Sequence, residues 1–181
     1  MHKAILDFME GFKREHPGFF SNKRILDMGS RDINGTPRHL FEGCEYVGVD
    51  KDPGPGVDVV SFMHEYDDGE GFDVVVTNGA LEHDKFCDLS VANGWRLMKP
   101  GGLFLGSAAG VNFPKHNLEL GVGGHYQSIS REMVEEWSRE FKIPFEITEA
   151  RGYKDIFFTA FKPQKSRRKE KPADDQLSEE A

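Results

Sequence analysis

Short apolar runs that alternate with helix-like segments are the feature of this sequence that most constrains its fold. The runs lie at residues 24–28, 45–50, 57–62, 72–78 and 103–109. Several carry apolar residues on both faces, as strands do when helices cover both faces of a sheet. Strands that alternate with helices form parallel sheets, because each parallel return needs a crossover. The pattern therefore predicts an α/β fold with a doubly wound, mostly parallel sheet.

The expected helices occupy the segments between and before these runs. They are placed at 2–15, from Thr36 onward, at 84–98 and from Ser130 onward. Apolar residues recur at helical spacing in the first, third and fourth of these segments. Thr36 and Ser130 are residue types that cap helix N-termini, and Pro37 suits a first helical position. Helices on both faces of the sheet are thus expected.

The last two expected strands differ from the others in their connection. They span 145–150 and 155–161, with a short turn at Gly152 between them. A turn this short forces antiparallel pairing, since a parallel return needs a crossover. The sequence thus predicts a Rossmann-like, seven-stranded sheet that is mostly parallel and has an antiparallel C-terminal strand.

The length of 181 residues suits one domain, expected at 1–161, with an N-terminal helix and linker over 1–22. From 162 to 181 almost no apolar residue occurs, and we expect a disordered charged tail. The net charge of −8 makes nucleic acid an unlikely partner class. Two cysteines without CxxC spacing, an N-terminus unlike a signal peptide and no membrane-length apolar run predict a cytoplasmic protein without a membrane partner.

The stretch "RILDMGSRDINGT" carries the strongest functional signal. A short strand ends at Asp27, and a polar loop with Gly29 and Gly35 follows. The next strand ends at Asp50, where a carboxylate can accept both hydroxyls of a ribose. In a doubly wound sheet, ligands bind beyond the carboxyl ends of the strands. Dinucleotides and S-adenosylmethionine both fit this arrangement.

The loop sequence favours the methyl donor over a dinucleotide. A dinucleotide loop has the pattern G-x-G-x-x-G, whose backbone amides close on a pyrophosphate. Here the middle glycine is absent, and Asp32 would repel a pyrophosphate. S-adenosylmethionine has no phosphate and carries a sulfonium and an ammonium, which suit Asp27 and Asp32. Arg31 suits its carboxylate.

The chain resembles class I S-adenosylmethionine-dependent methyltransferases of the broad small-molecule type. The resemblance rests on "ILDMGSRDINGT", "YVGVDKDPGPGVDVV", "FDVVVTNGALEH" and "LMKPGGLFLGSAA", and it covers 24–161. The loop departs from the usual acid-x-G-x-G-x-G, since Arg31 and Ile33 replace the later glycines.

The resemblance implies a set of residues around S-adenosylmethionine. Those expected to border the donor are Asp27, Gly29, Ser30, Arg31, Gly35, Asp50, Lys51, Phe62, His64, Asn78, Gly79 and Leu81. Within this set, Asp50 would hold the ribose, with Lys51 beside it. Phe62 and His64 would lie near the adenine, and Asn78 would help form the floor near the methyl group.

Three histidines are candidates for a general base, because imidazole titrates in the required range. His83 follows the fourth strand, whereas His116 and His125 lie in the long loop after the fifth. His125 and His83 are the catalytic candidates, although "LEH" also occurs in this superfamily without a catalytic role. The loop from 109 to 128 is expected to be a lid over the acceptor.

A metal is not expected at this site. Glu82, His83 and His125 can bind a cation, but the set is incomplete. Relatives that use a metal here have E-x-x-E-H, and Gly79 replaces the first acid of that pattern.

The predicted function is transfer of a methyl group from S-adenosylmethionine to oxygen or nitrogen of a small metabolite or sugar-like acceptor. "NGALEH" stands where the amino-methylating enzymes for adenine and cytosine have (N/D)PP(Y/F), which counts against base methylation. A catalytically inactive domain that binds a ligand or a partner is the alternative, and an NAD-dependent oxidoreductase is a third reading. The oligomeric state does not follow from the sequence.

Overall fold

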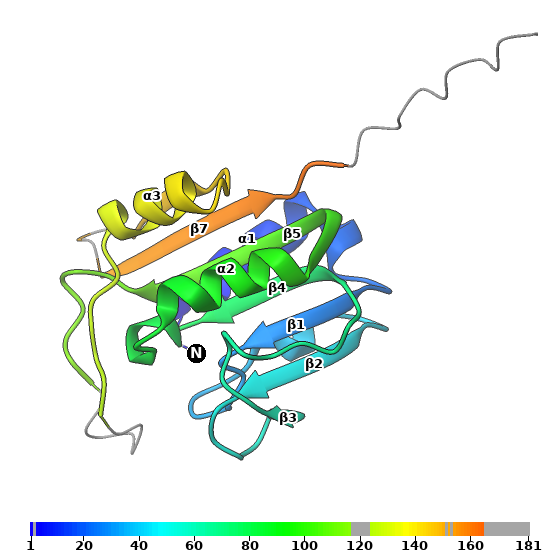
Figure 1. Ribbon diagram of the computed structural model, residues 1–181, viewed down its shortest axis with the longest axis horizontal. Helices are drawn as coiled ribbons and strands as arrows, with labels where there is room; N and C mark the ends of the chain where they lie inside the picture. The colour runs from blue at the N-terminus through cyan, green and yellow to red at the C-terminus, as the bar shows by residue number, and fades with distance from the viewer. Residues whose placement is uncertain (2, 117–123, 151, 153, 165–181) are drawn as a thin grey trace, which may run out of the picture.

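A seven-stranded sheet forms the centre of the molecule in the computed structural model, which describes residues 1, 3–116, 124–150, 152 and 154–164 (Figure 1). Its strands are β1 (Arg24–Met28), β2 (Glu45–Asp50), β3 (Val59–Val60), β4 (Phe72–Asn78), β5 (Met98–Ala109), β6 (Glu146–Glu149) and β7 (Asp155–Phe161). The spatial order is β3-β2-β1-β4-β5-β7-β6. Every described pairing is parallel except those of β7, which runs antiparallel to β5 and β6. The predicted mostly parallel sheet with one antiparallel C-terminal strand is confirmed.

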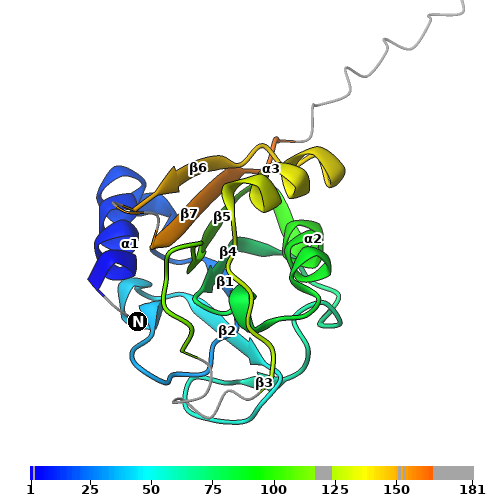
Figure 2. The ribbon, with the colours of Figure 1, turned by 90° about the vertical axis from the view of Figure 1, so that its left-hand side faces the viewer.

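Helices cover both faces of this sheet (Figure 2). The α-helices are α1 (Lys3–Glu15), α2 (Cys87–Leu97) and α3 (Arg131–Glu140), and short 3-10 helices span Pro17–Phe19, Pro37–Leu40 and Leu81–His83. In Figure 2, α1 lies on one side of the sheet, and α2 and α3 lie on the other. Ser130 caps α3, because its hydroxyl accepts the backbone N–H of Met133 at 3.3 Å. The doubly wound architecture expected from the alternating pattern is therefore present.

Two apolar cores separate these layers. Ile25, Val74 and Val76 pack toward α1, which contributes Ile5 and Met9 to that core. The other core faces α2 and α3, and it contains Leu26, Val75, Phe104, Val91 and Trp137. Neighbouring strand residues such as Leu26 and Ile25 alternate between the two cores, as the period of a strand requires. Burial on both sides explains why these strands are apolar at nearly every position.

The segment after β1 differs from the sequence expectation. Thr36 accepts the N–H of Arg38 at 3.2 Å, as an N-cap does, but only the 3-10 helix Pro37–Leu40 follows. At Phe41 the backbone is extended, with φ −100° and ψ 103°. The buried Phe41 ring stacks on Phe20, with centroids 4.8 Å apart. Tertiary packing of Phe41 thus stops the helix that the capping residues predicted.

Other boundaries also shift. The third strand shrinks from the expected 57–62 to Val59–Val60, since it pairs only with the end of β2. Helix α2 begins at Cys87 rather than near 84, and β5 begins at Met98. Of the expected tail, residues 162–164 are described. The ammonium of Lys162 donates to the carbonyls of Trp95 (2.6 Å) and Met98 (2.7 Å) at the end of α2. Residues 165–181 lie outside the described residues.

None of the helices among the described residues combines the length and the apolar character that crossing a membrane requires.

Candidate functional site

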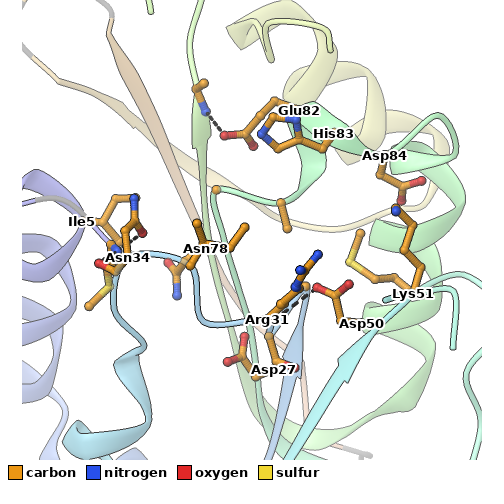
Figure 3. Close-up of a pocket in the computed structure, with 18 of the residues that line it drawn as sticks. Ile5, Asp27, Arg31, Asn34, Asp50, Lys51, Asn78, Glu82, His83 and Asp84 are labelled. Carbon is orange, nitrogen blue, oxygen red and sulfur yellow. Dashed lines mark hydrogen bonds between the residues drawn. The ribbon is translucent and has the colours of Figure 1, made fainter. Parts of the chain in front are cut away.

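A cavity of about 900 Å³ opens at the carboxyl ends of β1, β2, β4 and β5. The strand order reverses between β1 and β4, and this reversal is where doubly wound folds place a ligand. In Figure 3, Asp27, Arg31 and Asp50 lie together in one part of the cavity, and Glu82 and His83 lie in another. Its volume lies in the range of small-molecule sites, about 300–1,000 Å³.

The turn after β1 admits only glycine at its first position. Gly29 has φ +82°, and a Cβ built there would lie 2.1 Å from the Cβ of Ala80. The amides of Gly29 and Ser30 both donate to the carbonyl of Val49, at 2.8 and 3.1 Å. The turn is thereby held between β2 and the segment after β4, and both Gly29 and Ser30 line the cavity.

The rest of the loop closes on itself. The N–H of Gly35 donates to the carboxylate of Asp32 at 2.6 Å, and the N–H of Asp32 donates to the carbonyl of Pro55 at 2.8 Å. Gly35 and Arg31 line the cavity, whereas Asp32 is not among its lining residues. The Asp32 carboxylate therefore supports the loop from behind, rather than facing a ligand as the charge argument supposed.

Asp50 is oriented by two backbone amides. Its carboxylate oxygens accept the N–H of Arg31 at 3.2 Å and that of Asp52 at 3.0 Å. Arg31 and Lys51 line the cavity beside it, and both pair with Asp52. Asp50 is half-buried at the end of β2 and lines the cavity. The carboxylate is thus preorganised to accept hydroxyl groups.

Asp27 lies deeper, at the end of β1, and is only 3% exposed. It accepts the hydroxyl of Tyr46 at 2.8 Å. Burial raises the pKa of Asp27 to about 7, although the Tyr46 hydrogen bond favours the charged form. Tyr46, on the neighbouring strand β2, holds this carboxylate through its hydroxyl, and the sequence analysis did not identify it.

The end of β4 forms one wall of the cavity. The side-chain oxygen of Asn78 accepts the hydroxyl of Ser107 at 2.9 Å, and its amide nitrogen is buried without a partner among the described residues. The N–H of Gly79 donates to the carbonyl of Ser107 at 2.9 Å. Asn78 and Gly79 therefore line the cavity from a fixed position, with a free amide donor.

Glu82 and His83 follow in the 3-10 helix Leu81–His83 and line another part of the cavity. Glu82 is 2% exposed; one of its oxygens accepts the N–H of Ala109 at 3.2 Å, and the other has no partner among the described residues. Burial raises the pKa of Glu82 to about 7. Burial and the nearby His116 lower the pKa of His83, which favours the neutral imidazole.

The three candidate histidines lie in this region. The Nε2 atoms of His83 and His116 are 3.3 Å apart. His125 lines the cavity, and its Nε2 is buried without a partner among the described residues. The loop expected to act as a lid includes residues 117–123, which lie outside the described residues.

Two of the predicted donor residues do not line the cavity. Leu81 is 1% exposed and belongs to the core facing α2 and α3. His64 lies between the rings of Phe62 and Phe86, with centroid distances of 5.7 and 4.6 Å. Phe62 lines the cavity and remains 48% exposed.

Asp155 is the most informative residue that sequence analysis missed. It is 5% exposed, lines the cavity, and its charge contributes to the raised pKa of Glu82. It pairs with Ala109, at the end of β5. An antiparallel strand begins at the edge where its parallel neighbours end, so the predicted antiparallel pairing contained the signal for this residue. Other lining residues that were not predicted include Asn34, Asp84, Phe86 and Lys154.

No protein-family model matches this sequence, and no curated protein is significantly similar to it. Solved structures do match. The 1,6-didemethyltoxoflavin-N1-methyltransferase of Burkholderia thailandensis, solved with 1,6-didemethyltoxoflavin and S-adenosylhomocysteine, is 19% identical; the match covers 89% of this chain and 79% of that chain, with a TM-score of 0.67.

Two further structures show the same fold. Phosphoethanolamine N-methyltransferase 2 of Haemonchus contortus, with S-adenosyl-L-methionine, is 18% identical over 87% of this chain and 53% of that chain, with a TM-score of 0.65. Magnesium protoporphyrin IX methyltransferase of Synechocystis, with bound S-adenosylmethionine, is 11% identical over 88% and 78%, with a TM-score of 0.61. The chain therefore has the class I methyltransferase fold.

Proposed function

We propose that this protein is an S-adenosylmethionine-dependent methyltransferase that acts on oxygen or nitrogen of a small acceptor. The observation that carries the proposal is the preorganised Asp50 carboxylate beside the Gly29 turn, at the point where the strand order reverses. A carboxylate held by two amides keeps a fixed geometry for two neighbouring hydroxyls, such as those of a ribose. The fold shared with enzymes solved with this donor or with its demethylated product, S-adenosylhomocysteine, supports the same ligand.

The remaining cavity residues suit the other parts of the donor. Asp27, Gly29, Ser30 and Gly35 border the proposed methionine end, where Arg31 offers a partner for a carboxylate. Lys51 lies beside the proposed ribose position, and Asn78 and Gly79 lie beneath the proposed methyl position. The exposed ring of Phe62 offers a face to the adenine, and His64 supports that ring. Leu81 does not contact the donor directly in this arrangement; it packs in the core that faces α2 and α3 and supports the cavity wall from there.

The loop geometry argues against a dinucleotide. A pyrophosphate site uses free backbone amides at the N-terminus of a helix. In this chain the amide of Gly35 already donates to Asp32, and the following 3-10 helix has only four residues, Pro37–Leu40. The oxidoreductase reading therefore lacks the phosphate-binding elements it needs among the described residues.

S-adenosylmethionine would supply a methyl group that is bonded to a sulfonium sulfur. The acceptor atom bonds to the methyl carbon in line with the carbon–sulfur bond, and the sulfur leaves as the thioether of S-adenosylhomocysteine. The protein then needs to hold the acceptor against the donor and exclude water, which accounts for much of the rate in such reactions. An acceptor that must lose a proton also needs a base. We assign this role to His125, which lines the cavity, because the Nε2 of His83 already faces His116.

The acceptor is proposed only as a small molecule. The neighbours named above are named for a toxoflavin precursor, phosphoethanolamine and magnesium protoporphyrin IX. The first two are N-methyltransferases, but the three acceptors differ widely in size and structure. The part of the cavity bounded by His83, His125, Lys154 and Asp155 is where an acceptor would lie. It offers both charged and neutral hydrogen-bonding groups, as a polar metabolite or sugar requires.

Calorimetric titration with S-adenosylmethionine and S-adenosylhomocysteine tests the proposed donor. We expect both to bind with one site per chain and NADH not to bind. Tight NADH binding with neither sulfur compound bound would contradict the proposal and support the oxidoreductase. Donor binding without methyl transfer to any of a broad acceptor set would favour the catalytically inactive alternative.

The His125→Gln variant tests the proposed base. We expect turnover to fall by about 100-fold or more, since a general base contributes roughly 10²–10⁴, while donor affinity stays unchanged. Initial rates over a pH series check this, with His39→Ala as a control, because His39 is exposed and outside the cavity. Unchanged turnover and an unchanged pH profile would remove His125 from the mechanism.

A further inference from the structure

Glu82, His83 and His116 bring three metal-binding groups to one wall of the cavity. One ligand atom from each lies within 4.8 Å of the others. Glu82 and His83 are neighbours in the 3-10 helix after β4, and His116 comes from the segment after β5. From this geometry we propose that the three residues bind one divalent transition-metal ion. The sequence expectation of no metal considered His125 as the third ligand and did not include His116.

The spacing of the two imidazoles fits a shared ion. The Nε2 atoms of His83 and His116 are 3.3 Å apart. Zinc–nitrogen bonds measure about 2.0–2.1 Å, so two nitrogens at neighbouring corners of a tetrahedron lie about 3.3 Å apart. The ring nitrogens therefore already stand at the separation of two ligands, and a carboxylate oxygen of Glu82 lies within 4.8 Å of a nitrogen of each ring.

The protonation of His116 supports ligation through the same atom. Its Nδ1 lies 3.0 Å from the carbonyl of Pro114. A carbonyl only accepts hydrogen bonds, so Nδ1 carries the proton and Nε2 presents a lone pair toward His83. Metal-binding histidines commonly donate their other ring nitrogen to a carbonyl in this way, which fixes the ring and its tautomer.

Glu82 supplies an independent observation. It is 2% exposed, and one carboxylate oxygen has no partner among the described residues. A buried carboxylate is costly unless it is paired, protonated or bound to a metal. A cation between Glu82 and the two imidazoles would give this oxygen a partner.

The ligand types select the class of ion. Imidazole favours zinc and its neighbours among the transition metals, whereas magnesium and calcium prefer oxygen ligands. Two histidines and one glutamate also leave a coordination position open, as in catalytic zinc sites. That position would face the cavity, where the ion could bind an acceptor oxygen and lower the pKa of the acceptor. This role in methyl transfer rests on the proposed function, whereas metal binding itself does not.

Titration of tag-free, chelator-treated protein with Zn²⁺ alone tests the site, in the absence of any methyl donor. We expect one ion per chain by calorimetry, and a visible spectrum typical of tetrahedral cobalt when Co²⁺ is used instead. His116→Ala should weaken Zn²⁺ binding by more than about tenfold, since losing a ligand costs at least as much as losing its supporting partner. His39→Ala, the exposed control, should bind like the wild type.

The proposal is overturned if the wild type binds no Zn²⁺, or if His116→Ala binds as tightly as His39→Ala. Circular dichroism checks that each variant is folded. If His116→Ala is unfolded, Glu82→Gln carries the test, because its amide oxygen can still accept the N–H of Ala109. Donor titration of the same preparation separates a failed metal site from a failed donor site.

Discussion

Replacing Asp50 with alanine is expected to weaken S-adenosylhomocysteine binding by roughly 10- to 150-fold. Hydrogen bonds to a charged group contribute about 1.5–3 kcal/mol, and this carboxylate is the group proposed to hold the ribose. Its two oxygens are already aligned by the amides of Arg31 and Asp52, so the folded chain pays little to orient it. Calorimetric titration of the purified variant measures the loss.

Two further variants make this result specific. Asp50→Asn keeps one oxygen acceptor and removes the charge, so its affinity should lie between those of the wild type and Asp50→Ala. Asp7→Ala removes an exposed carboxylate on α1 that pairs with Lys3, and it should bind like the wild type. Equal donor affinity in Asp50→Ala and Asp7→Ala would show that the donor site is placed wrongly.

The second large effect concerns the Gly29 turn, where Gly29→Ala should lower the free energy of unfolding by about 2–5 kcal/mol. A left-handed conformation costs a residue with a Cβ about 1–2 kcal/mol. The added methyl would also lie 2.1 Å from the Cβ of Ala80, and such overpacking costs about 1–3 kcal/mol more. Urea denaturation of the wild type and the variant measures the difference.

Gly18→Ala is the matched control for this variant. Gly18 has no positive φ, and a Cβ there would meet no atom within 4 Å. Its free energy of unfolding should therefore change by no more than about 0.5 kcal/mol. If Gly29→Ala had the same free energy of unfolding as Gly18→Ala, this result would contradict the close contact between the turn and Ala80.

The sequence by itself determined the sheet and one side of the site. Its apolar runs located β1, β2, β4 and β5, because strands buried on both faces must be apolar at almost every position. The Gly29 turn and Asp50 follow directly from those strands, since the carboxyl ends of parallel strands meet at one edge. A short turn between the last two strands was enough to predict that β7 is antiparallel.

The tertiary structure decided features that depend on residues far apart in the chain. Capping residues at Thr36 and Pro37 predicted a longer helix, but packing of Phe41 on Phe20 ends it after a short 3-10 turn. The sequence predicted that Asp32 faces a ligand, but its carboxylate accepts a hydrogen bond from the N–H of Gly35. A local pattern records what a residue can do, and its neighbours in space decide which partner it takes.

The grouping around Glu82 and His83 shows the same limit most clearly. The sequence supplied "LEH" and two later histidines, but no spacing rule distinguishes His116 from His125 as the neighbour of His83. Asp155 also reaches this region only because β7 begins where β5 ends. Periodicity and residue type determine which strands form and where each one ends. Which side chains of separate loops meet depends on the three-dimensional path of those loops, and only the folded structure contains it.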